Sequence, residues 1–322
     1  MTRLLSDSAI ERLREAADSP DLAGTRYRLV EKLGQGGMGG VFRVEDTALD
    51  RQVALKVISV ADPDETSSFR LLQEAHVIAK LEHPGIVPVH DAGLLSDGRP
   101  YYTMKLVQGR RLEEHVATVP ALSDRLRIFL RICDAVAFAH AHGVLHRDLK
   151  PSNVMVGPFG EVLVMDWGLS KLMAEKVENS ASSSVDPGPK KPDSSATSFG
   201  TVLGTPGYMS PEQSRGESVD QRADVYSLGT ILQFLSADLS HVPRALAAIR
   251  KQAIAGDRTK RYQTVQDLAS DVAHFLDGLP VSAYPEGRLT RAWRWIVRNG
   301  VWILLLLAYV AARALLIFFR PR

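Results

Sequence analysis

The sequence predicts an α+β protein with two lobes, the first rich in β-strands and the second helical, followed by one transmembrane helix. Strand-like patterns fill residues 27–107, helix-like patterns fill residues 110–276, and an apolar run occupies residues 300–319. The chain has 322 residues, of which 45% are apolar and 24% charged, so it can bury a sizeable core. Residues 1–26 are expected to form an N-terminal extension, and residues 277–299 a basic linker before the membrane.

The first lobe reads as strands because Val, Ile, Leu and Tyr recur in short runs between Gly, Pro and Asp. One stretch, residues 67–81, instead places Leu71, Ala75 and Ile78 at helical spacing and predicts a helix. The predicted strands are Tyr27–Leu33, Val41–Glu45, Gln52–Ile58, Ile86–His90 and Tyr101–Val107.

The second lobe shows helical spacing of its apolar residues. Ser123 is expected to cap one helix, and Thr264 with Asp267 is expected to cap a later one. Residues 173–200 contain seven Ser and three Pro and have no periodicity, so this stretch cannot bury enough apolar surface to order itself. We therefore expect a disordered insertion within the second lobe.

The composition also restricts the partners of the chain. Cys133 is the only cysteine, which excludes an intramolecular disulfide and a thiolate zinc cluster and indicates a reducing compartment. Residues 281–322 carry seven Arg and one acidic residue, which leaves 32 basic and 36 acidic residues in the rest of the chain. Because basic side chains cluster only beside the apolar run, no nucleic-acid partner is expected. The closely spaced His140, His142 and His146 lack a fourth ligand or acidic partner at metal spacing, so no zinc site is expected.

The apolar run of residues 300–319 predicts a single transmembrane helix, because twenty residues at about 1.5 Å each span a bilayer core of about 30 Å. Its continuous apolarity argues against a buried helix and against an anchor lying in the membrane plane. Arg313 lies near the C-terminal edge of the run, where its side chain can reach the headgroups. Arg residues are more numerous before the run than after it, so the N-terminal body is expected in the cytoplasm, attached to the cell membrane.

A glycine-rich stretch lies between the first two predicted strands. Its glycines allow backbone N–H groups to approach phosphate oxygens closely, although a simple hairpin turn also explains the pattern. A dinucleotide-binding loop would need a helix after it, and here a strand follows. The residues of this stretch are Gly34, Gln35, Gly36, Gly37, Met38, Gly39, Gly40 and Val41.

The next strand carries one lysine, Lys56, within the apolar run of residues 53–57. A buried ammonium group needs a partner of opposite charge, and a site of this kind also suits phosphates. Glu74, in the predicted helix that follows, is the expected carboxylate partner. The alternative for Glu74 is a surface position on the outer side of that helix.

The strongest motif is HRDLKPSN at residues 146–153, followed by DWG at residues 166–168. With the glycine-rich stretch and VALK at residues 53–56, these motifs occur in the order typical of eukaryotic-like (Hanks-type) Ser/Thr protein kinases. The sequence resembles that family, in its bacterial membrane-anchored form, over residues 27–276, and GTPGYMSPE at residues 204–212 resembles the end of an activation segment. The resemblance implies a bilobal protein-kinase fold with a small β-rich N-lobe and a large helical C-lobe.

The resemblance implies a non-specific Ser/Thr protein kinase that transfers the γ-phosphate of ATP to hydroxyls of protein substrates, with ATP and Mg²⁺ as cofactors. Asp148 would orient and deprotonate the substrate hydroxyl, and Lys150 would neutralise charge on the γ-phosphate. Asn153 and Asp166 would hold Mg²⁺ through oxygen atoms.

The same resemblance implies the nucleotide site. Lys56 would bind the α- and β-phosphates while paired with Glu74, and the end of the fifth predicted strand would contact adenine through its backbone. The implied nucleotide-binding residues are Leu33, the stretch from Gly34 to Val41, Ala54, Lys56, Glu74, Met104, Lys105 and Val107.

Some positions depart from the family pattern. Trp167 stands where Phe is usual, and Ser210 replaces a small Ala. Between Asp224 and Arg261 the chain is much shorter than usual, so a helix and a loop of the large lobe, usually a docking surface, are expected to be reduced or absent. Arg261 is still expected to form a buried ion pair with Glu212.

Arg147 indicates control by phosphorylation, because in this family an Arg at this place pairs with a phosphorylated activation segment. Thr205 is instead expected to contact Asp148. The candidate phosphorylation sites are Thr197, Ser198 and Thr201.

Two other functions share this fold. A pseudokinase would bind nucleotide without turnover, but every catalytic position is filled here. A small-molecule phosphotransferase would not need the stretch at residues 204–212. A homodimer through the small lobe or the membrane span is compatible with the sequence, although no small-xxx-small pattern supports it.

Overall fold

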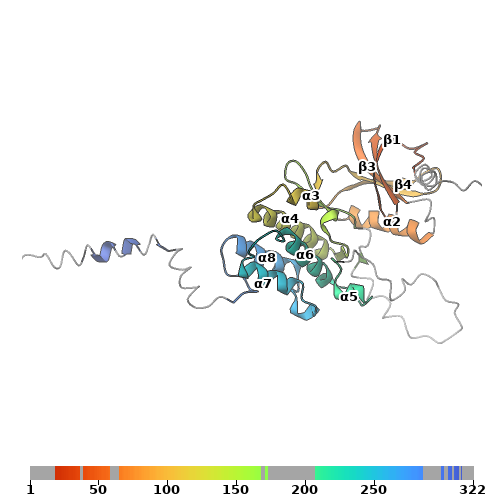
Figure 1. Ribbon diagram of the computed structural model, residues 1–322. Coiled ribbons are helices and arrows are strands. Elements are labelled where there is room, and N and C mark those ends of the chain that lie inside the picture. The colour runs from red at the N-terminus through yellow and green to blue at the C-terminus, as the bar shows by residue number, and fades with distance from the viewer. Residues whose placement is uncertain are drawn as a thin grey trace, which may run out of the picture.

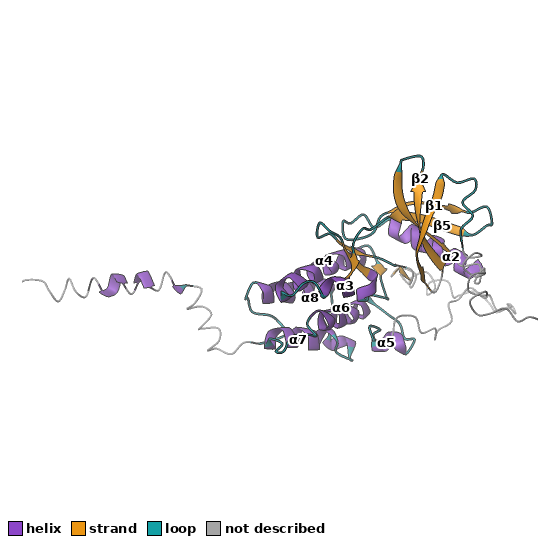
Figure 2. Ribbon diagram, turned by 45° about the horizontal axis from the view of Figure 1, so that its top comes forward, coloured by secondary structure: helices purple, strands orange, loops and turns teal. Residues whose placement is uncertain are grey.

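The computed structural model describes residues 19–36, 39–58, 65–167, 171–172, 207–285, 299–300, 304–306, 308–311 and 313. They form one lobe around a β-sheet and one lobe of helices (Figure 1). Figure 2 shows the long strands at one end with α2 against them, and the other long helices at the opposite end. The predicted bilobal α+β fold is confirmed. The predicted insertion at residues 173–200 lies outside the described residues.

The small lobe contains a five-stranded antiparallel sheet with the strand order β1-β2-β3-β5-β4. Helix α2 (Glu65–Ala79) packs against one face of this sheet. The strands are β1 (Tyr27–Gly36), β2 (Gly39–Asp46), β3 (Arg51–Ile58), β4 (Val89–Leu94) and β5 (Pro100–Lys105).

The two faces of the sheet bury different side chains, because successive residues of a strand point to opposite sides. On one face Tyr101 packs in a cluster with Tyr27 and Leu55. On the other face Tyr102 packs in a cluster with Leu71 of α2. Neighbouring residues of β5 therefore belong to separate cores, and only the second core holds α2 on the sheet.

The strand predicted at residues 86–90 is wrong in its position. The observed strand β4 begins at Val89, and Ile86 forms only an isolated parallel bridge with Val164 of the large lobe. Pro88 explains the shift, because proline has no N–H to donate to a sheet ladder. The other predicted strands and the helix at residues 67–81 are confirmed, with ends that differ by a few residues.

The large lobe is built around helices α4, α6 and α8, whose buried faces share one apolar core. Phe129 of α4, Leu228 of α6 and Leu268 of α8 are among its fully buried side chains. The helices of this lobe are α3 (Leu112–Val116), α4 (Leu122–Ala141), η1 (Pro151–Asn153), α5 (Pro211–Ser214), α6 (Gln221–Leu235), α7 (Arg244–Ala253), η4 (Arg258–Lys260) and α8 (Val265–Leu276).

Short strands of the large lobe flank the HRDLKPSN motif at residues 146–153, which we call the catalytic loop. Three of them form a small antiparallel sheet in the order β6-β8-β9, and β7 pairs with β10. Their bounds are β6 (Arg110–Arg111), β7 (Val144–Leu145), β8 (Val154–Val156), β9 (Val162–Val164) and β10 (Lys171–Leu172).

One of the two predicted helix caps is confirmed. The Thr264 side chain accepts a hydrogen bond from the backbone N–H of Asp267 at 3.1 Å and caps α8. The cap predicted at Ser123 is wrong, because α4 already begins at Leu122 after an extended Ala121. Leu122 packs against the large-lobe core, and the helix begins two residues earlier than a cap at Ser123 would place it.

The connection after α6 is short, as predicted. Only residues 236–243 separate α6 from α7, and all of them are described and none is helical. Arg250 of α7 donates to the Ser236 hydroxyl at 3.2 Å, so α7 follows α6 directly in space as well as in sequence.

Most of the predicted transmembrane helix lies outside the described residues. Of residues 300–319, the structure describes 300, 304–306, 308–311 and 313, which are helical in short pieces. Within the described part of the chain, no helix has the length and apolarity needed to cross a membrane.

Candidate active site

The ammonium group of Lys56 links the two lobes. Its Nζ lies 2.9 and 3.1 Å from the two carboxylate oxygens of Glu74 on α2, and 2.8 Å from Oδ1 of Asp166 in the large lobe. Lys56 lies on β3, opposite Tyr102 of β5 in the ladder. The predicted pairing with Glu74 is therefore observed, and Glu74 is buried rather than on the outer side of its helix.

Lys56 and Asp166 stabilise each other's charged forms. Burial alone would lower the pKa of Lys56, but its neighbours Tyr102, Glu74 and Asp166 raise this pKa well above its usual value. Partial burial opposes ionisation of Asp166, yet the ammonium of Lys56 brings the pKa of Asp166 below its usual value. Both groups are charged at neutral pH, as a site for phosphates and a cation requires.

The catalytic-loop motif holds three polar side chains together. Nζ of Lys150 donates to Oδ2 of Asp148 at 2.7 Å. Nδ2 of Asn153, in η1, donates to the backbone carbonyl of Asp148 at 2.8 Å and to its Oδ2 at 3.2 Å. The loop therefore closes on itself, and these bonds fix the orientation of the Asp148 carboxylate.

Asp224 of α6 anchors this loop from inside the large lobe. Its carboxylate accepts hydrogen bonds from the backbone N–H of His146 at 2.9 Å and of Arg147 at 2.8 Å. It is also bound by Nε2 of His140 at 2.7 Å. Burial would raise the pKa of Asp224, but its hydrogen bond to His140 and the nearby imidazoles lower it instead. A buried carboxylate with these partners gives the loop a rigid base.

Further contacts connect the catalytic loop to the residues before Asp166. Nε2 of His146 is 3.0 Å from the carbonyl oxygen of Met165, and the N–H of Met165 donates to the carbonyl of Asn153 at 2.8 Å. Arg147 and Asp166 both have positive φ angles, 67° and 63°. Such backbone conformations are unfavourable for residues other than glycine and are kept where the surrounding bonds enforce them.

Trp167, the residue after Asp166, is held in place by packing and a hydrogen bond. It is 1% exposed, its ring centre lies 4.6 Å from that of His146, and its Nε1 donates to the carbonyl of Val164 at 3.3 Å. A Phe at this position could pack in the same place but could not donate this hydrogen bond.

The glycine-rich stretch forms the hairpin of β1 and β2, as its place between two strands predicts. At Gly39 a Cβ atom would lie 2.0 Å from the carbonyl oxygen of Val57 on β3, so only glycine fits there. Gly37 and Met38, between β1 and β2 in the sequence, lie outside the described residues. The paired residues are Gly34 with Val41, Gln35 with Gly40 and Gly36 with Gly39.

The other residues implied to bind the nucleotide lie on β1, on β3, and at or just beyond the end of β5. Ala54 is buried and pairs with Met104 across the β3–β5 ladder. Lys105 is exposed, Val107 is half-buried beyond the end of β5, and Leu33 is largely exposed on β1. The structure thus brings Ala54 and Met104 together on the strand pair that carries Lys56.

The residues implied to bind Mg²⁺ offer suitable atoms. Asp166 presents a carboxylate that is 54% exposed. The amide nitrogen of Asn153 is bound to Asp148, which leaves its oxygen for a cation. Carboxylate and amide oxygens are ligands that Mg²⁺ accepts together with phosphate oxygens. No group of three His, Cys, Asp or Glu that could hold a metal ion is found in the described ranges.

The end of the segment that resembles an activation segment is hydrogen-bonded to the catalytic loop and to α6. Ser210 and Gln213 form a capping box at the start of α5, and Nε2 of Gln213 donates to the carbonyl of Arg147 at 2.7 Å. The hydroxyl of Ser227 donates to the carbonyl of Tyr208 at 2.8 Å. The candidate phosphorylation sites and Thr205 lie outside the described residues.

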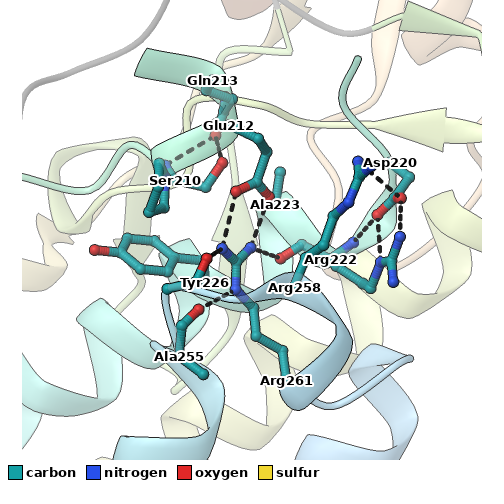
Figure 3. A network of polar contacts seen from close by, with 12 residues as sticks. Ser210, Glu212, Gln213, Asp220, Arg222, Ala223, Tyr226, Ala255, Arg258 and Arg261 are labelled. Atoms are coloured by element: carbon teal, nitrogen blue, oxygen red, sulfur yellow. Dashed lines mark hydrogen bonds and ion pairs between the residues drawn. The ribbon is translucent and has the colours of Figure 1, made fainter. Parts of the chain in front are cut away.

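The predicted ion pair between Arg261 and Glu212 is confirmed (Figure 3). Two guanidinium nitrogens of Arg261 donate to the two carboxylate oxygens at 2.6 and 2.8 Å, and both residues are 2% exposed. Arg261 also donates to the carbonyls of Ala255 and Arg222 and lies 5.0 Å from the ring centre of Tyr226. These contacts satisfy a charge that would otherwise be buried without partners.

Two side chains near the site have contacts that the motifs do not predict. His140 has an acidic partner after all, Asp224, which lies 84 residues away and outside any local spacing rule. Tyr102 donates from its hydroxyl to Oε1 of Glu74 at 2.9 Å. A tyrosine in a buried strand usually needs a partner for its hydroxyl, and this rule is the sequence feature that could have predicted a polar contact of Tyr102.

Comparison with known proteins identifies the family. The sequence matches the model of the protein kinase domain over residues 27–296. It is 34% identical over 297 residues to "Serine/threonine-protein kinase PknD" of Protochlamydia amoebophila, covering 78% of this chain and 30% of that protein. It is 33% identical over 302 residues to "Probable serine/threonine-protein kinase PknB" of Bifidobacterium longum, covering 81% of this chain and 41% of that protein.

Solved structures agree with the sequence comparisons. The kinase domain of Mycobacterium tuberculosis PknI has a TM-score of 0.57 and 27% identity, with 80% of this chain and 98% of that chain covered. The chain spans 30% to 41% of the length of the two curated relatives named above. The chain belongs to the protein kinase domain family, among the bacterial Hanks-type Ser/Thr kinases.

Proposed function

We propose that the chain is an ATP-dependent Ser/Thr protein kinase that transfers the γ-phosphate to hydroxyls of protein substrates. The observation that carries this proposal is the joint contact of Lys56 with Glu74 and Asp166, beside a catalytic loop bonded to the same segment. Two anionic groups and one ammonium, held by separate elements, form a charge pattern suited to a nucleotide triphosphate with its cation.

We assign to each side chain the role that the family resemblance implies for it. The Asp148 carboxylate accepts the proton of the substrate hydroxyl as that oxygen attacks phosphorus, and Lys150 offsets negative charge beside it. Lys56 binds phosphate oxygens while Glu74 holds its ammonium in place. Mg²⁺, when bound, would draw charge from the phosphate oxygens, and Asp166 would hold it together with the amide oxygen of Asn153.

Substrates with Ser or Thr acceptors are favoured by two observations. The relatives over this region carry Ser/Thr kinase names. Lys150, two residues after Asp148, is the residue that the family resemblance associates with Ser/Thr rather than Tyr acceptors. We expect casein-like acceptors to be phosphorylated on Ser and Thr.

The test replaces the proton acceptor. Purified full-length chain is incubated with ATP, Mg²⁺ and casein, and Asp148→Asn is compared with Asp134→Asn, an exposed aspartate on α4. We expect Asp148→Asn to reduce phosphate transfer at least about a hundredfold and Asp134→Asn to leave it unchanged. Transfer by Asp148→Asn at the normal rate would contradict the proposal. Nucleotide binding by the normal protein without any transfer would identify a pseudokinase instead.

We further propose a single membrane span at residues 300–319 with the kinase domain in the cytoplasm. The support is the continuous apolar run and the excess of arginine before it. We expect the full-length chain to stay in the membrane pellet after alkaline carbonate extraction, and a variant without residues 300–319 to be released. Release of both forms would contradict the span.

Autophosphorylation of the activation segment is part of the same proposal. The support is Arg147 in the catalytic loop and three hydroxyl residues shortly before residues 204–212. Mass spectrometry after incubation with ATP is expected to find phosphate on Thr197, Ser198 or Thr201, and none in the Asp148→Asn variant. A homodimer would assist such a reaction, and sedimentation of the detergent-solubilised chain would measure it.

A further inference from the structure

Tyr102 lies at the junction between the sheet and α2. It is 2% exposed and packs with Ile58 of β3 and with Leu71 and Ala75 of α2. Its ring is therefore part of the small apolar core that holds α2 against the sheet. Its hydroxyl points beyond this core to the carboxylate of Glu74.

Tyr102 contacts both members of the ion pair that defines the site. Its hydroxyl donates to Oε1 of Glu74 at 2.9 Å, the same oxygen that lies 2.9 Å from Nζ of Lys56. The Lys56 ammonium also lies 5.8 Å from the centre of the Tyr102 ring, within the range of a cation–π contact. Among the described side chains, only Lys56 and Tyr102 donate to the Glu74 carboxylate.

The hydroxyl is a permanent donor in this position. Burial raises the pKa of Tyr102 well above its usual value, so the phenol stays neutral at any working pH. A buried carboxylate is stabilised by each donor that replaces water, and a bond from a neutral donor to a charged acceptor is stronger than a neutral pair. A second donor therefore favours the inward position of Glu74 over one in which α2 turns it toward solvent.

We propose that Tyr102 is a positioning residue, whose hydroxyl holds Glu74 in the orientation that directs the Lys56 ammonium toward phosphate oxygens. This inference rests on the proposed kinase function. The competing explanation is that Tyr102 only fills space between β5 and α2, in which case its hydroxyl has no effect on nucleotide binding.

The neighbouring tyrosine supplies a matched control. Tyr101 lies on the same strand and is also buried, but it faces the opposite side of the sheet, packs against Tyr27 and contacts neither Lys56 nor Glu74. Tyr102→Phe and Tyr101→Phe each remove one hydroxyl from β5 and keep the ring. Thermal unfolding of both variants checks that they remain folded.

Nucleotide binding is measured by calorimetry with ADP and Mg²⁺, and transfer is measured with casein. We expect Tyr102→Phe to weaken nucleotide binding and to lower kcat/KM for ATP, each by about tenfold, while KM for casein and the behaviour of Tyr101→Phe stay normal. Equal effects of the two variants would overturn the inference. Absence of transfer by the normal protein would contradict the proposed function, whereas the binding comparison would still decide the role of Tyr102.

A double-mutant cycle tests whether Tyr102 acts through Glu74. In a Glu74→Ala background, Tyr102→Phe is expected to cause no further loss of ADP affinity, because the group that it positions is gone. An undiminished loss in that background would overturn the inference and assign the effect to packing. If Glu74→Ala does not fold, hydrogen exchange of the α2 amides decides: faster exchange is expected in Tyr102→Phe and unchanged exchange in Tyr101→Phe.

Discussion

Lys56 Nζ lies 2.8 Å from Oδ1 of Asp166, a residue 110 positions later in the chain and in the other lobe. The same ammonium is bound by Glu74, so one cation joins strand β3, helix α2 and the segment after β9. The two lobes therefore meet at a charged centre. A change in the position of Lys56 would therefore change the distances from its ammonium group to both carboxylates.

Replacing Lys56 tests this centre directly. Lys56→Met keeps most of the length of the side chain but removes its charge, so Glu74 and Asp166 lose their common partner. We expect phosphate transfer to casein to fall at least about a hundredfold, because stabilisation of phosphate charge is the main contribution of such a site. The rate is measured with labelled ATP at saturating casein.

A matched variant controls for the loss of a lysine. Lys80→Met changes an exposed lysine just after α2 and should leave transfer within about twofold of normal. Equal activity of Lys56→Met and the normal chain would show that the charged centre does not bind the transferred nucleotide.

The Arg261–Glu212 ion pair should support the stability of the large lobe. In Arg261→Ala the Glu212 carboxylate remains buried without its bidentate partner, and Ala255 and Arg222 each lose a donor for a carbonyl. Breaking one side of a buried ion pair typically costs about 3–5 kcal/mol of unfolding free energy. Urea unfolding, followed by circular dichroism, measures this loss.

Arg258→Ala is the control for this prediction. Arg258 is 40% exposed and lies 4.0 Å from Asp220, which is also exposed. An exposed ion pair contributes about 0–1 kcal/mol, so this variant should unfold close to the normal urea concentration. Similar losses in Arg258→Ala and Arg261→Ala would mean that burial does not distinguish the two pairs.

Much of the fold and site follows from sequence because local rules and ordered motifs agree. The strands around Lys56, the helix with Glu74 and the pair of Glu212 with Arg261 all lie where pattern and motif predict them. Lys56 could be interpreted from the sequence because a charge in an apolar strand requires a partner. Glu74 could be chosen as this partner because it is an acidic residue beside the apolar face of the predicted helix.

The parts that the sequence did not predict depend on contacts between distant segments. The hydrogen bond of His140 with Asp224 spans 84 residues, and no spacing rule relates two positions so far apart. The isolated bridge between Ile86 and Val164 joins residues of different lobes, which a local pattern cannot include. Tertiary packing also decided the first turn of α4, where Ser123 was the better local cap but Leu122 had a core to fill.

Acid should destabilise the large lobe through two buried carboxylates. Burial would raise the pKa of Glu212, but hydrogen bonds from Arg261 bring this pKa below its ordinary value of 4.5. Likewise the pKa of Asp224 lies below its ordinary value of 3.8 despite burial, because of its bond to His140. A lowered native pKa means that the unfolded chain binds more protons in acid.

The two carboxylates therefore stabilise the folded chain at pH values above their ordinary pKa values. This stabilisation is lost as the pH falls through their lower pKa values in the folded chain. We expect the unfolding free energy to decrease as the pH falls below 4.5. Over the same pH range, the difference in unfolding free energy between the normal chain and Arg261→Ala should become smaller. Urea titrations at successive pH values measure both. A constant difference between the two proteins would contradict the role of Glu212 in this pH dependence.

Trp167→Phe should loosen the segment that presents Asp166. The variant keeps an aromatic ring beside His146 but removes the indole donor to the Val164 carbonyl and leaves part of the Trp volume empty. We expect a loss of about 1–3 kcal/mol in unfolding free energy and a several-fold rise in the Mg²⁺ concentration needed for half-maximal transfer. A change in stability with no change in Mg²⁺ dependence would mean that Trp167 supports the fold without orienting Asp166.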